Sequence, residues 1–273
     1  MPFSHVSGRI VRALARRWSS GLEVGALYWD ALDRELDRSG AANAIFWWRD
    51  DDAVAATPQL LRLLSLRDEL DIPLSLAVIS ALAEPNLATV LNVCSREALS
   101  ILVHGWDHSN HAGPGEPEAE FAPRRRPSEV AEQLVEARRR LESQFGNRVL
   151  PVLVPPWNRL SPHLIDGVRS AGFTHVSVEG DFAGLRIPAR NVHADVMDWN
   201  SGSGMDGARL VGDIIVALRL RRYGAVGRCA PIGILTHHSA HDEGAWLLTA
   251  TLLERLKRHP AVVFLEESEL WKP

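Results

Sequence analysis

Four consecutive charged residues, Arg49-Asp50-Asp51-Asp52, directly follow the apolar run Ala44–Trp48. Adjacent carboxylates repel one another and raise one another's pKa. A protein keeps three of them where a cation neutralises the charge or where a shifted pKa is useful. A turn or helix cap is the simpler structural interpretation, but it does not require three acids. The cluster therefore predicts a metal site with a carboxylate base beside it.

A pair of histidines, His104 and His108, follows the next-but-one apolar run, Leu99–Val103. A helical turn or a tight loop brings imidazoles four positions apart onto one face. Two histidines and one carboxylate are a common ligand set for Zn²⁺ and other divalent ions. Asp51 and Asp52 point to opposite sides if the strand continues through them. One of them could then be the third ligand while the other faces the attacking water.

A further group of histidines, His237, His238 and His241, follows the apolar run Ile232–Thr236. Histidine is suited to general acid catalysis because its pKa lies near the working pH. We expect one of the three to be catalytic. The others are expected to support the site or to precede a helix capped by Asp242.

Three tryptophans, Trp106, Trp157 and Trp199, lie beside these polar clusters, and Asn158 adjoins one of them. Aromatic faces near a polar site suit a sugar ring or a small acyl group. Core packing is the alternative interpretation, and it accounts for most of the nine tryptophans of the chain.

Eight short apolar runs alternate with amphipathic segments along the chain. The runs are Ala44–Trp48, Leu74–Ile79, Leu99–Val103, Val149–Val154, His175–Val178, Asn191–Met197, Ile232–Thr236 and Ala261–Leu265. Strands joined by helices pair in parallel through right-handed crossovers. The pattern therefore predicts an α/β fold, a distorted (β/α) barrel of seven or eight parallel strands, with a doubly wound open sheet as the alternative. Polar clusters follow most of the runs, and in a barrel the active site lies at that end of the strands.

The amphipathic segments between the runs predict helices. Their expected ranges are 7–38, Thr57–Leu70, Pro85–Arg96, Ser128–Phe145, Ser161 to near Gly172, Asp206–Arg221 and Asp242–His259. The irregular insert Ser109–Pro127 directly follows the histidine pair, so we expect it to be a lid or a substrate wall rather than disordered decoration. No linker is evident, so we expect one domain over 1–273 with an N-terminal helical extension at about 1–40.

Composition excludes several classes of function. The 273 residues carry a net charge of −4 and no long basic patch, so nucleic acid is not an expected partner. No stretch reaches the ~18 apolar residues of a membrane span, so no stable membrane insertion is expected. Two cysteines and no continuous apolar signal segment predict a cytoplasmic protein. The sequence makes no prediction of oligomeric state.

In this order, the clusters resemble the motifs of the polysaccharide deacetylase family, also called the NodB-homology or family 4 carbohydrate esterase group. The resemblance covers about 44–265. The family's first motif ends in Asp-Asp, matching Asp51-Asp52, and its second, His-x-x-x-His, matches His104 and His108.

The other three motifs match less completely. The third, usually Arg-x-Pro-Tyr/Trp, matches Val154-Pro155-Pro156-Trp157 only in its second half, so its arginine is missing. Arg49 or Arg159 is the expected replacement. The fourth motif matches Asp198-Trp199, and the fifth, Leu-x-His, matches Leu235-Thr236-His237. These departures indicate a divergent branch.

The resemblance implies a metal-dependent hydrolase that removes an N-acetyl or other acyl group from a carbohydrate or glycan precursor. It implies Asp52, His104 and His108 as metal ligands. Zn²⁺ is the first choice of ion, with Co²⁺, Ni²⁺ or Mn²⁺ as alternatives.

The remaining roles that the resemblance implies concern proton transfer and substrate binding. Asp51 would take a proton from water, and His237 would protonate the departing amine with Asp198 as its orienting partner. The expected substrate pocket consists of Trp157, Asn158, Trp199 and Trp106. The alternatives are hydrolysis of a small amide such as a ureide, and an inactive carbohydrate-binding relative.

Overall fold

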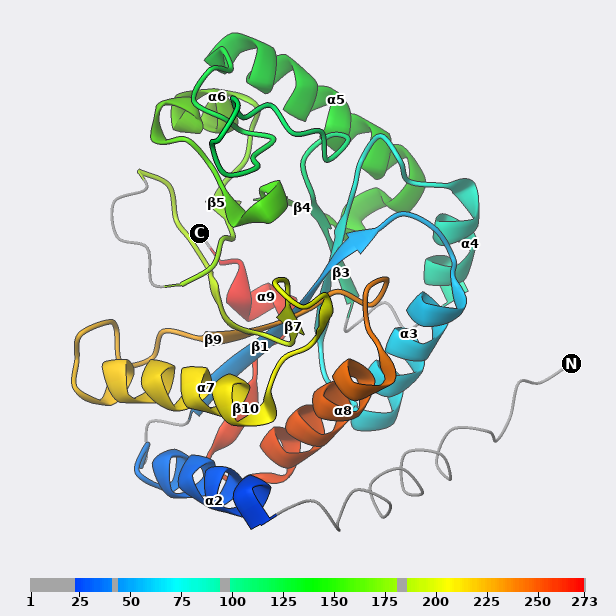
Figure 1. Cartoon of the computed structure of the whole chain (residues 1–273). Coiled ribbons are helices and arrows are strands. Elements are labelled where there is room, and N and C mark those ends of the chain that lie inside the picture. Colours follow the sequence, from blue (N-terminus) through cyan, green and yellow to red (C-terminus); the bar gives the residue numbers. More distant parts are fainter. Residues whose placement is uncertain (1–22, 41–43, 94–98, 181–185, 273) are drawn as a thin grey trace, which may run out of the picture.

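The computed structural model describes residues 23–40, 44–93, 99–180 and 186–272. Eight strands form one parallel sheet, with seven in the order β5-β4-β3-β2-β1-β9-β6 and β10 paired with β1 (Figure 1). The strands are β1 (Ala44–Ala53), β2 (Leu74–Val78), β3 (Leu99–Val103), β4 (Val149–Leu153), β5 (His175–Val176), β6 (Val192–Asp195), β9 (Ile232–Thr236) and β10 (Val262–Phe264). Every predicted run overlaps one of these strands, and only β1 extends beyond its run.

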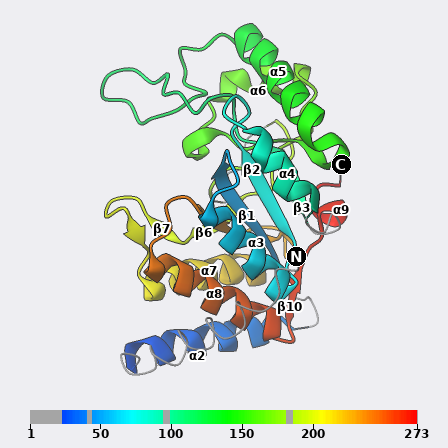
Figure 2. The ribbon, with the colours of Figure 1, turned by 90° about the vertical axis from the view of Figure 1, so that its right-hand side faces the viewer.

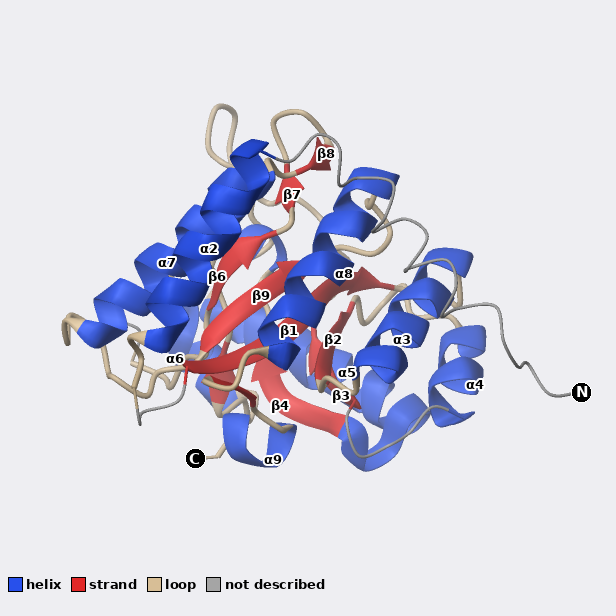
Figure 3. Ribbon diagram, turned by 90° about the horizontal axis from the view of Figure 1, so that it is seen from below, coloured by secondary structure: helices blue, strands red, loops and turns tan. Residues whose placement is uncertain are grey.

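The sheet is curled rather than flat. Its two outer strands approach each other through isolated parallel bridges, Val176 with Ala189 and Glu179 with Val192. In Figure 3 the helices lie around the outside of the curved strands. The predicted distorted (β/α) barrel is therefore confirmed, in the form of a seven-strand curled half-barrel, and the doubly wound open sheet is not found.

The helices begin largely where their capping residues predict. The α-helices are α2 (Glu23–Asp37), α3 (Pro58–Leu70), α4 (Pro85–Val93), α5 (Pro127–Phe145), α6 (Ile165–Ser170), α7 (Gly207–Arg222), α8 (Glu243–Arg258) and α9 (Glu267–Leu270). The side chains of Thr57, Asp206 and Asp242 each accept a hydrogen bond from a backbone N–H of the first turn of α3, α7 and α8. Helix α5 begins at Pro127, one residue before its predicted range, because proline is pre-organised for a first helical position.

Ion pairs hold α2, the first helix of the described residues, against the barrel. Glu35 of α2 is buried and forms ion pairs with Arg219 and Arg222 of α7. Figure 2 shows α2 at the edge of the molecule, beneath α7 and α8. The expected helical region at 7–38 is therefore confirmed over Glu23–Asp37, and its first part lies outside the described residues.

The core consists of the strands and the inner faces of these helices. All five residues of β2, β3 and β9 are buried, as is typical of parallel strands covered on both faces. Each fully buried Leu or Ile there contributes about 1.5–3 kcal/mol relative to exposure. Trp47 and Trp48 are also buried, and their indole N–H groups donate to Asn191 O and Thr236 Oγ1.

None of the helices in the described ranges is both long and apolar enough to cross a bilayer.

Strand β1 is longer than its apolar run, and the three aspartates lie within it. Pairing with β9 continues to Asp50 opposite Thr236, whereas the register with β2 shifts between Asp50 and Ala53. Asp52 lies in that irregularity with a φ of 67°. The kink changes the direction of the strand end, so that the carboxylates of neighbouring aspartates point in different directions and contact different residues.

Candidate metal centre and active site

Asp52, His104 and His108 converge at the carboxyl ends of β1 and β3. Oδ1 of Asp52 lies 3.0 Å from Nε2 of His104 and 3.5 Å from Nε2 of His108, and the three ligand atoms lie within 4.8 Å of one another. Ligand atoms bonded to one ion at about 2.1 Å are separated by roughly 3.0–3.4 Å. The donor types and their spacing therefore fit one divalent ion.

The tautomer of His104 also fits a metal ligand. Its Nδ1 lies 3.0 Å from the backbone carbonyl of Val154, so the Nδ1–H can donate there, and Nε2, the atom beside Asp52, would bind a metal once it loses its proton. Burial would raise the pKa of Asp52, but the hydrogen bond and charge of His104 keep it well below its usual value. Asp52 is thus a carboxylate, ready to bind a cation.

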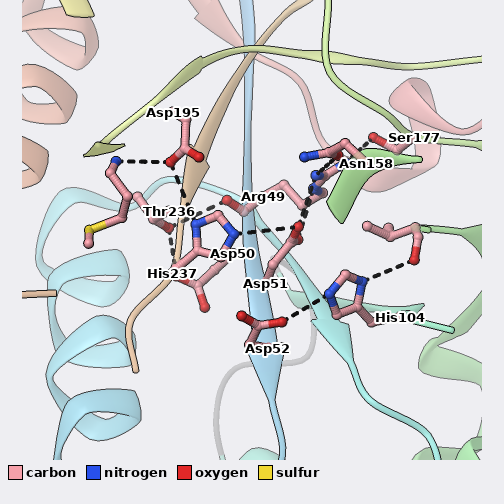
Figure 4. Close-up of polar contacts among 12 residues, drawn as sticks. Arg49, Asp50, Asp51, Asp52, His104, Asn158, Ser177, Asp195, Thr236 and His237 are labelled. Carbon is pink, nitrogen blue, oxygen red and sulfur yellow. Dashed lines mark hydrogen bonds and ion pairs between the residues drawn. The ribbon is translucent and has the colours of Figure 1, made fainter. Parts of the chain in front are cut away.

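Asp51 points away from this triad, into a second set of contacts on the same strand (Figure 4). Its Oδ2 accepts a hydrogen bond from Nη2 of Arg49 at 2.9 Å, and its Oδ1 lies 2.9 Å from Nε of Arg49 as an ion-pair contact outside hydrogen-bond alignment. Arg49 also donates to Ser177 Oγ at 2.6 Å and to Asn158 Oδ1 at 2.7 Å. The guanidinium is fully buried, so it fixes Asp51 rigidly.

Arg49 therefore takes the position expected for an arginine that supports the base. The other candidate, Arg159, is exposed and donates instead to the carbonyl of Glu118. Ser177, which completes the Arg49 contacts, had not been predicted. It directly follows the short β5, and nothing in the local sequence distinguishes a serine at that position as a site residue.

His237 is the histidine of the third cluster that reaches Asp51, with 4.0 Å between Nε2 and Asp51 Oδ2. On its other side, Nδ1 lies 3.5 Å from Oδ1 of Asp195. Asp195 is in turn held by the backbone N–H of Met197 at 2.9 Å and the indole N–H of Trp199 at 2.8 Å. Burial lowers the pKa of His237, but the ion pair with Asp195 and the nearby charges of Asp51 and Asp52 raise it to about 9.

Asp195, not Asp198, is thus the carboxylate beside His237. Asp198 had been expected there, but its Oδ1 accepts the backbone N–H of Asn200 in a turn between β7 (Met197–Asp198) and β8 (Ser203–Gly204). The predicted strand extends to Met197, whereas β6 ends at Asp195. Placing the strand end correctly would have identified Asp195.

The third acid of the cluster has a separate partner. Asp50 is fully buried, and its Oδ2 accepts hydrogen bonds from Thr236 Oγ1 at 2.6 Å and the backbone N–H of His238 at 3.0 Å. Nδ1 of His238 lies 2.5 Å from its Oδ1. Asp50 therefore ties the ends of β1 and β9 together and is not paired with Arg49.

The aromatic residues divide between site and core. The Trp157 ring lies 4.1 Å from the ring of His108, and the half-exposed Trp199 ring lies 4.6 Å from that of His237, centroid to centroid. Trp106 packs against the hydrophobic core instead. Trp157 and Trp199 therefore each lie against a histidine of the site, whereas Trp106 has a packing role.

Backbone strain is concentrated at the site. Asp52, His108, Trp157 and Asn158 have φ between 55° and 67°, a region that non-glycine residues rarely adopt. Such conformations cost about 1–3 kcal/mol each and persist where surrounding contacts impose them. All four residues contact or flank the proposed ligands and base.

Comparison with known proteins identifies the fold. No protein-family model matches the sequence, and no curated protein matches it. Among solved structures, a family 4 acetyl xylan esterase from Clostridium thermocellum in complex with a cobalt ion aligns with a TM-score of 0.54 at 15% identity, over 83% of this chain and 90% of that one. A peptidoglycan N-acetylglucosamine deacetylase aligns with a TM-score of 0.55 at 12% identity, over 85% and 89%.

A third match concerns activity. A mutant of a family 4 pseudoenzyme with restored enzymatic activity aligns with a TM-score of 0.50 at 14% identity, over 84% of this chain and 68% of that one. At these identities the similarity establishes the fold. The chain therefore has the fold of the family 4 polysaccharide deacetylases and acetyl xylan esterases, at a sequence identity of 12–15% to these structures.

Proposed function

We propose that this protein is a metal-dependent hydrolase that removes an N-acetyl group from a carbohydrate or glycan precursor. The observation that carries the proposal is the placement of Asp51 between two partners. Arg49 holds one side of its carboxylate, His237 lies 4.0 Å away, and the neighbouring Asp52 belongs to the ligand triad. A base, an acid and a metal site within one cluster are the components of amide hydrolysis.

Asp52, His104 and His108 would hold the ion, and we assign Zn²⁺ because two imidazoles and one carboxylate suit it. When bound, a divalent ion would supply polarisation of the acyl carbonyl and acidification of water. The mixed nitrogen and oxygen donors also accept Co²⁺, Ni²⁺ or Mn²⁺.

The protein's own groups perform the proton transfers. Asp51 takes a proton from the attacking water, and Arg49 keeps its oxygens aimed during that step. His237, whose pKa is raised, is protonated at neutral pH and donates its Nε2 proton to the departing amine. Asp195 on Nδ1 holds the imidazole in this orientation. Each proton transfer supplies typically ~10²- to 10⁴-fold in rate.

Two features support a substrate larger than a simple amide. The Trp157 and Trp199 rings flank the site, and such faces stack on sugar rings. A cavity of about 480 Å³ adjoins Asn158 and is lined by residues that include Phe121, Leu160 and Val178. This volume is typical of ligand sites and offers room for substrate beyond the acyl group.

The experiment that tests the proposal is acetate release from N-acetylated sugars, with a ureide in parallel. We expect turnover of an N-acetyl sugar by the metal-loaded wild type, and none by Asp51→Asn with its metal retained. Turnover of the ureide alone would contradict the carbohydrate assignment. Equal turnover by Asp51→Asn would contradict the role of the base.

A second candidate function is carbohydrate binding without catalysis. It is favoured by Val154, which occupies the position of the family's third-motif arginine, and by the structural match to a family 4 pseudoenzyme. Arg49 argues against it, since it supplies the missing guanidinium to Asp51. Glycan binding without acetate release in a metal-loaded protein would favour this second function.

A further inference from the structure

Glu120 of the insert is a buried carboxylate with an unusual set of partners. Its side chain is completely inaccessible to solvent. Oε1 accepts the backbone N–H of Trp106 at 2.7 Å, and Oε2 accepts the backbone N–H of His108 at 2.8 Å. Both donors belong to the short loop that carries the two histidine ligands.

The loop is shaped to receive this carboxylate. Gly105 has a φ of 59°, and a Cβ built at this position would lie 2.6 Å from Oε2 of Glu120. Only glycine leaves room for the carboxylate at that distance. His108, three residues further on, has a φ of 60°, which a non-glycine residue adopts only under constraint. The hydrogen bond to its N–H is such a constraint.

A carboxylate buried in this way is costly. Removing a charged group from water is unfavourable unless hydrogen bonds and counter-charges replace the water, and burial raises the pKa of Glu120. Among the described residues, the side-chain oxygens of Glu120 accept hydrogen bonds only from these two amides. A role in core packing would be met better by an apolar residue.

The insert that carries Glu120 is itself fixed to the neighbouring site loop. The backbone carbonyl of Phe121 accepts the N–H of Ser161 at 3.0 Å, and Arg159 donates to the carbonyl of Glu118 at 2.8 Å. The loop of Ser161 and Arg159 also contains Trp157, which packs on His108. Glu120 therefore connects an anchored wall to the metal-ligand loop.

We propose that Glu120 is a positioning residue of the metal site, whose carboxylate holds the backbone at 105–108 so that His108 faces Asp52 and His104. The inference rests on the metal site of the proposed function and extends it to the insert. The insert is then required for metal affinity as well as for enclosing the substrate cavity.

The test is the affinity for Zn²⁺, measured by chelator competition, in wild type, Glu120→Gln and Glu118→Gln. Glutamine presents an N–H₂ group to one of the two amide donors and loses that bond. We expect a Kd about 10- to 100-fold higher in Glu120→Gln, as for other groups that orient metal ligands. Glu118→Gln is the matched control, because that exposed residue contributes only its backbone carbonyl, and its Kd should equal that of the wild type.

A second readout requires no metal. Hydrogen exchange of the amides of Trp106 and His108 should be faster in metal-free Glu120→Gln than in metal-free wild type, with the exchange of β3 unchanged. If Glu120→Gln fails to fold, Gly105→Ala replaces it, since its Cβ displaces the carboxylate. A folded variant with wild-type Kd and wild-type exchange would overturn the inference. Absence of Zn²⁺ binding by the wild type would instead overturn the proposed function.

Discussion

Arg49 holds both carboxylate oxygens of Asp51, although the two residues are only two positions apart on β1. Residues at i and i+2 of a strand point to the same face, so one strand supplies both the base and its cationic support. The guanidinium also reaches Asn158 and Ser177 across the barrel. The third motif lacks its arginine, and Arg49, which lies next to the first motif, supplies the guanidinium instead.

Replacement of Arg49 by lysine tests this relationship. Lysine keeps the charge but cannot span both oxygens, so Asp51 should lose its orientation. We expect kcat to fall roughly 10²-fold, as for displacements of about 1 Å in other sites, with metal content unchanged. Arg159→Lys is the control and should retain full kcat. A larger loss in Arg159→Lys than in Arg49→Lys would reverse the assignment.

The pairing of His237 with Asp195 predicts a pH effect. The negative charge of Asp195 stabilises protonated His237, so its removal lowers the pKa of the imidazole. A general acid is active while protonated, and the rate should fall on the alkaline side at or below about pH 9, since a bound cation lowers the pKa further. In Asp195→Asn the alkaline limb of kcat/KM should move to lower pH.

Asp198→Asn is the matched control for that experiment. Asp198 lies three residues away and caps a turn, so its removal should leave the alkaline limb where it is in the wild type. A shift in Asp198→Asn without one in Asp195→Asn would restore Asp198 as the partner of His237.

Asp50 is predicted to matter for stability rather than for the metal. Asp50→Asn leaves His238 buried without its anionic partner, and breaking a buried pair in this way costs about 3–5 kcal/mol. Urea unfolding should show a loss of this order, while the folded variant still binds one equivalent of metal. Asp166→Asn, at an exposed side chain whose partner Arg186 is also exposed, should change stability by less than about 1 kcal/mol. Loss of metal with unchanged stability would place Asp50 in the ligand set instead.

Much of the fold follows from local sequence patterns. Apolar runs of strand length are buried on both faces, and Asp242 caps the helix that it is predicted to cap. The end of β6 was placed wrongly because the apolar pattern continues through Val196 and Met197 after the strand has ended at Asp195. The end of a strand depends on where its pairing with the adjacent strand stops, and that pairing cannot be read from the local sequence.

Some residues of the site can likewise be predicted from local sequence, and others depend on the tertiary structure. The ligand types at Asp52, His104 and His108 were predictable because their spacing is local and the resemblance orders them. The choice of Arg49 over Arg159 depended on tertiary geometry. Glu120 carried no signal, because its partners lie 12 and 14 residues away in an irregular segment without periodicity.

Metal content tests the central claim most directly. Elemental mass spectrometry of untagged wild type and His104→Ala should give about one equivalent of a transition metal in the wild type and little in the variant. His163→Ala, an exposed histidine outside the triad, should retain the wild-type content. Absence of metal from the wild type even after reloading, or equal content in His104→Ala, would contradict the account.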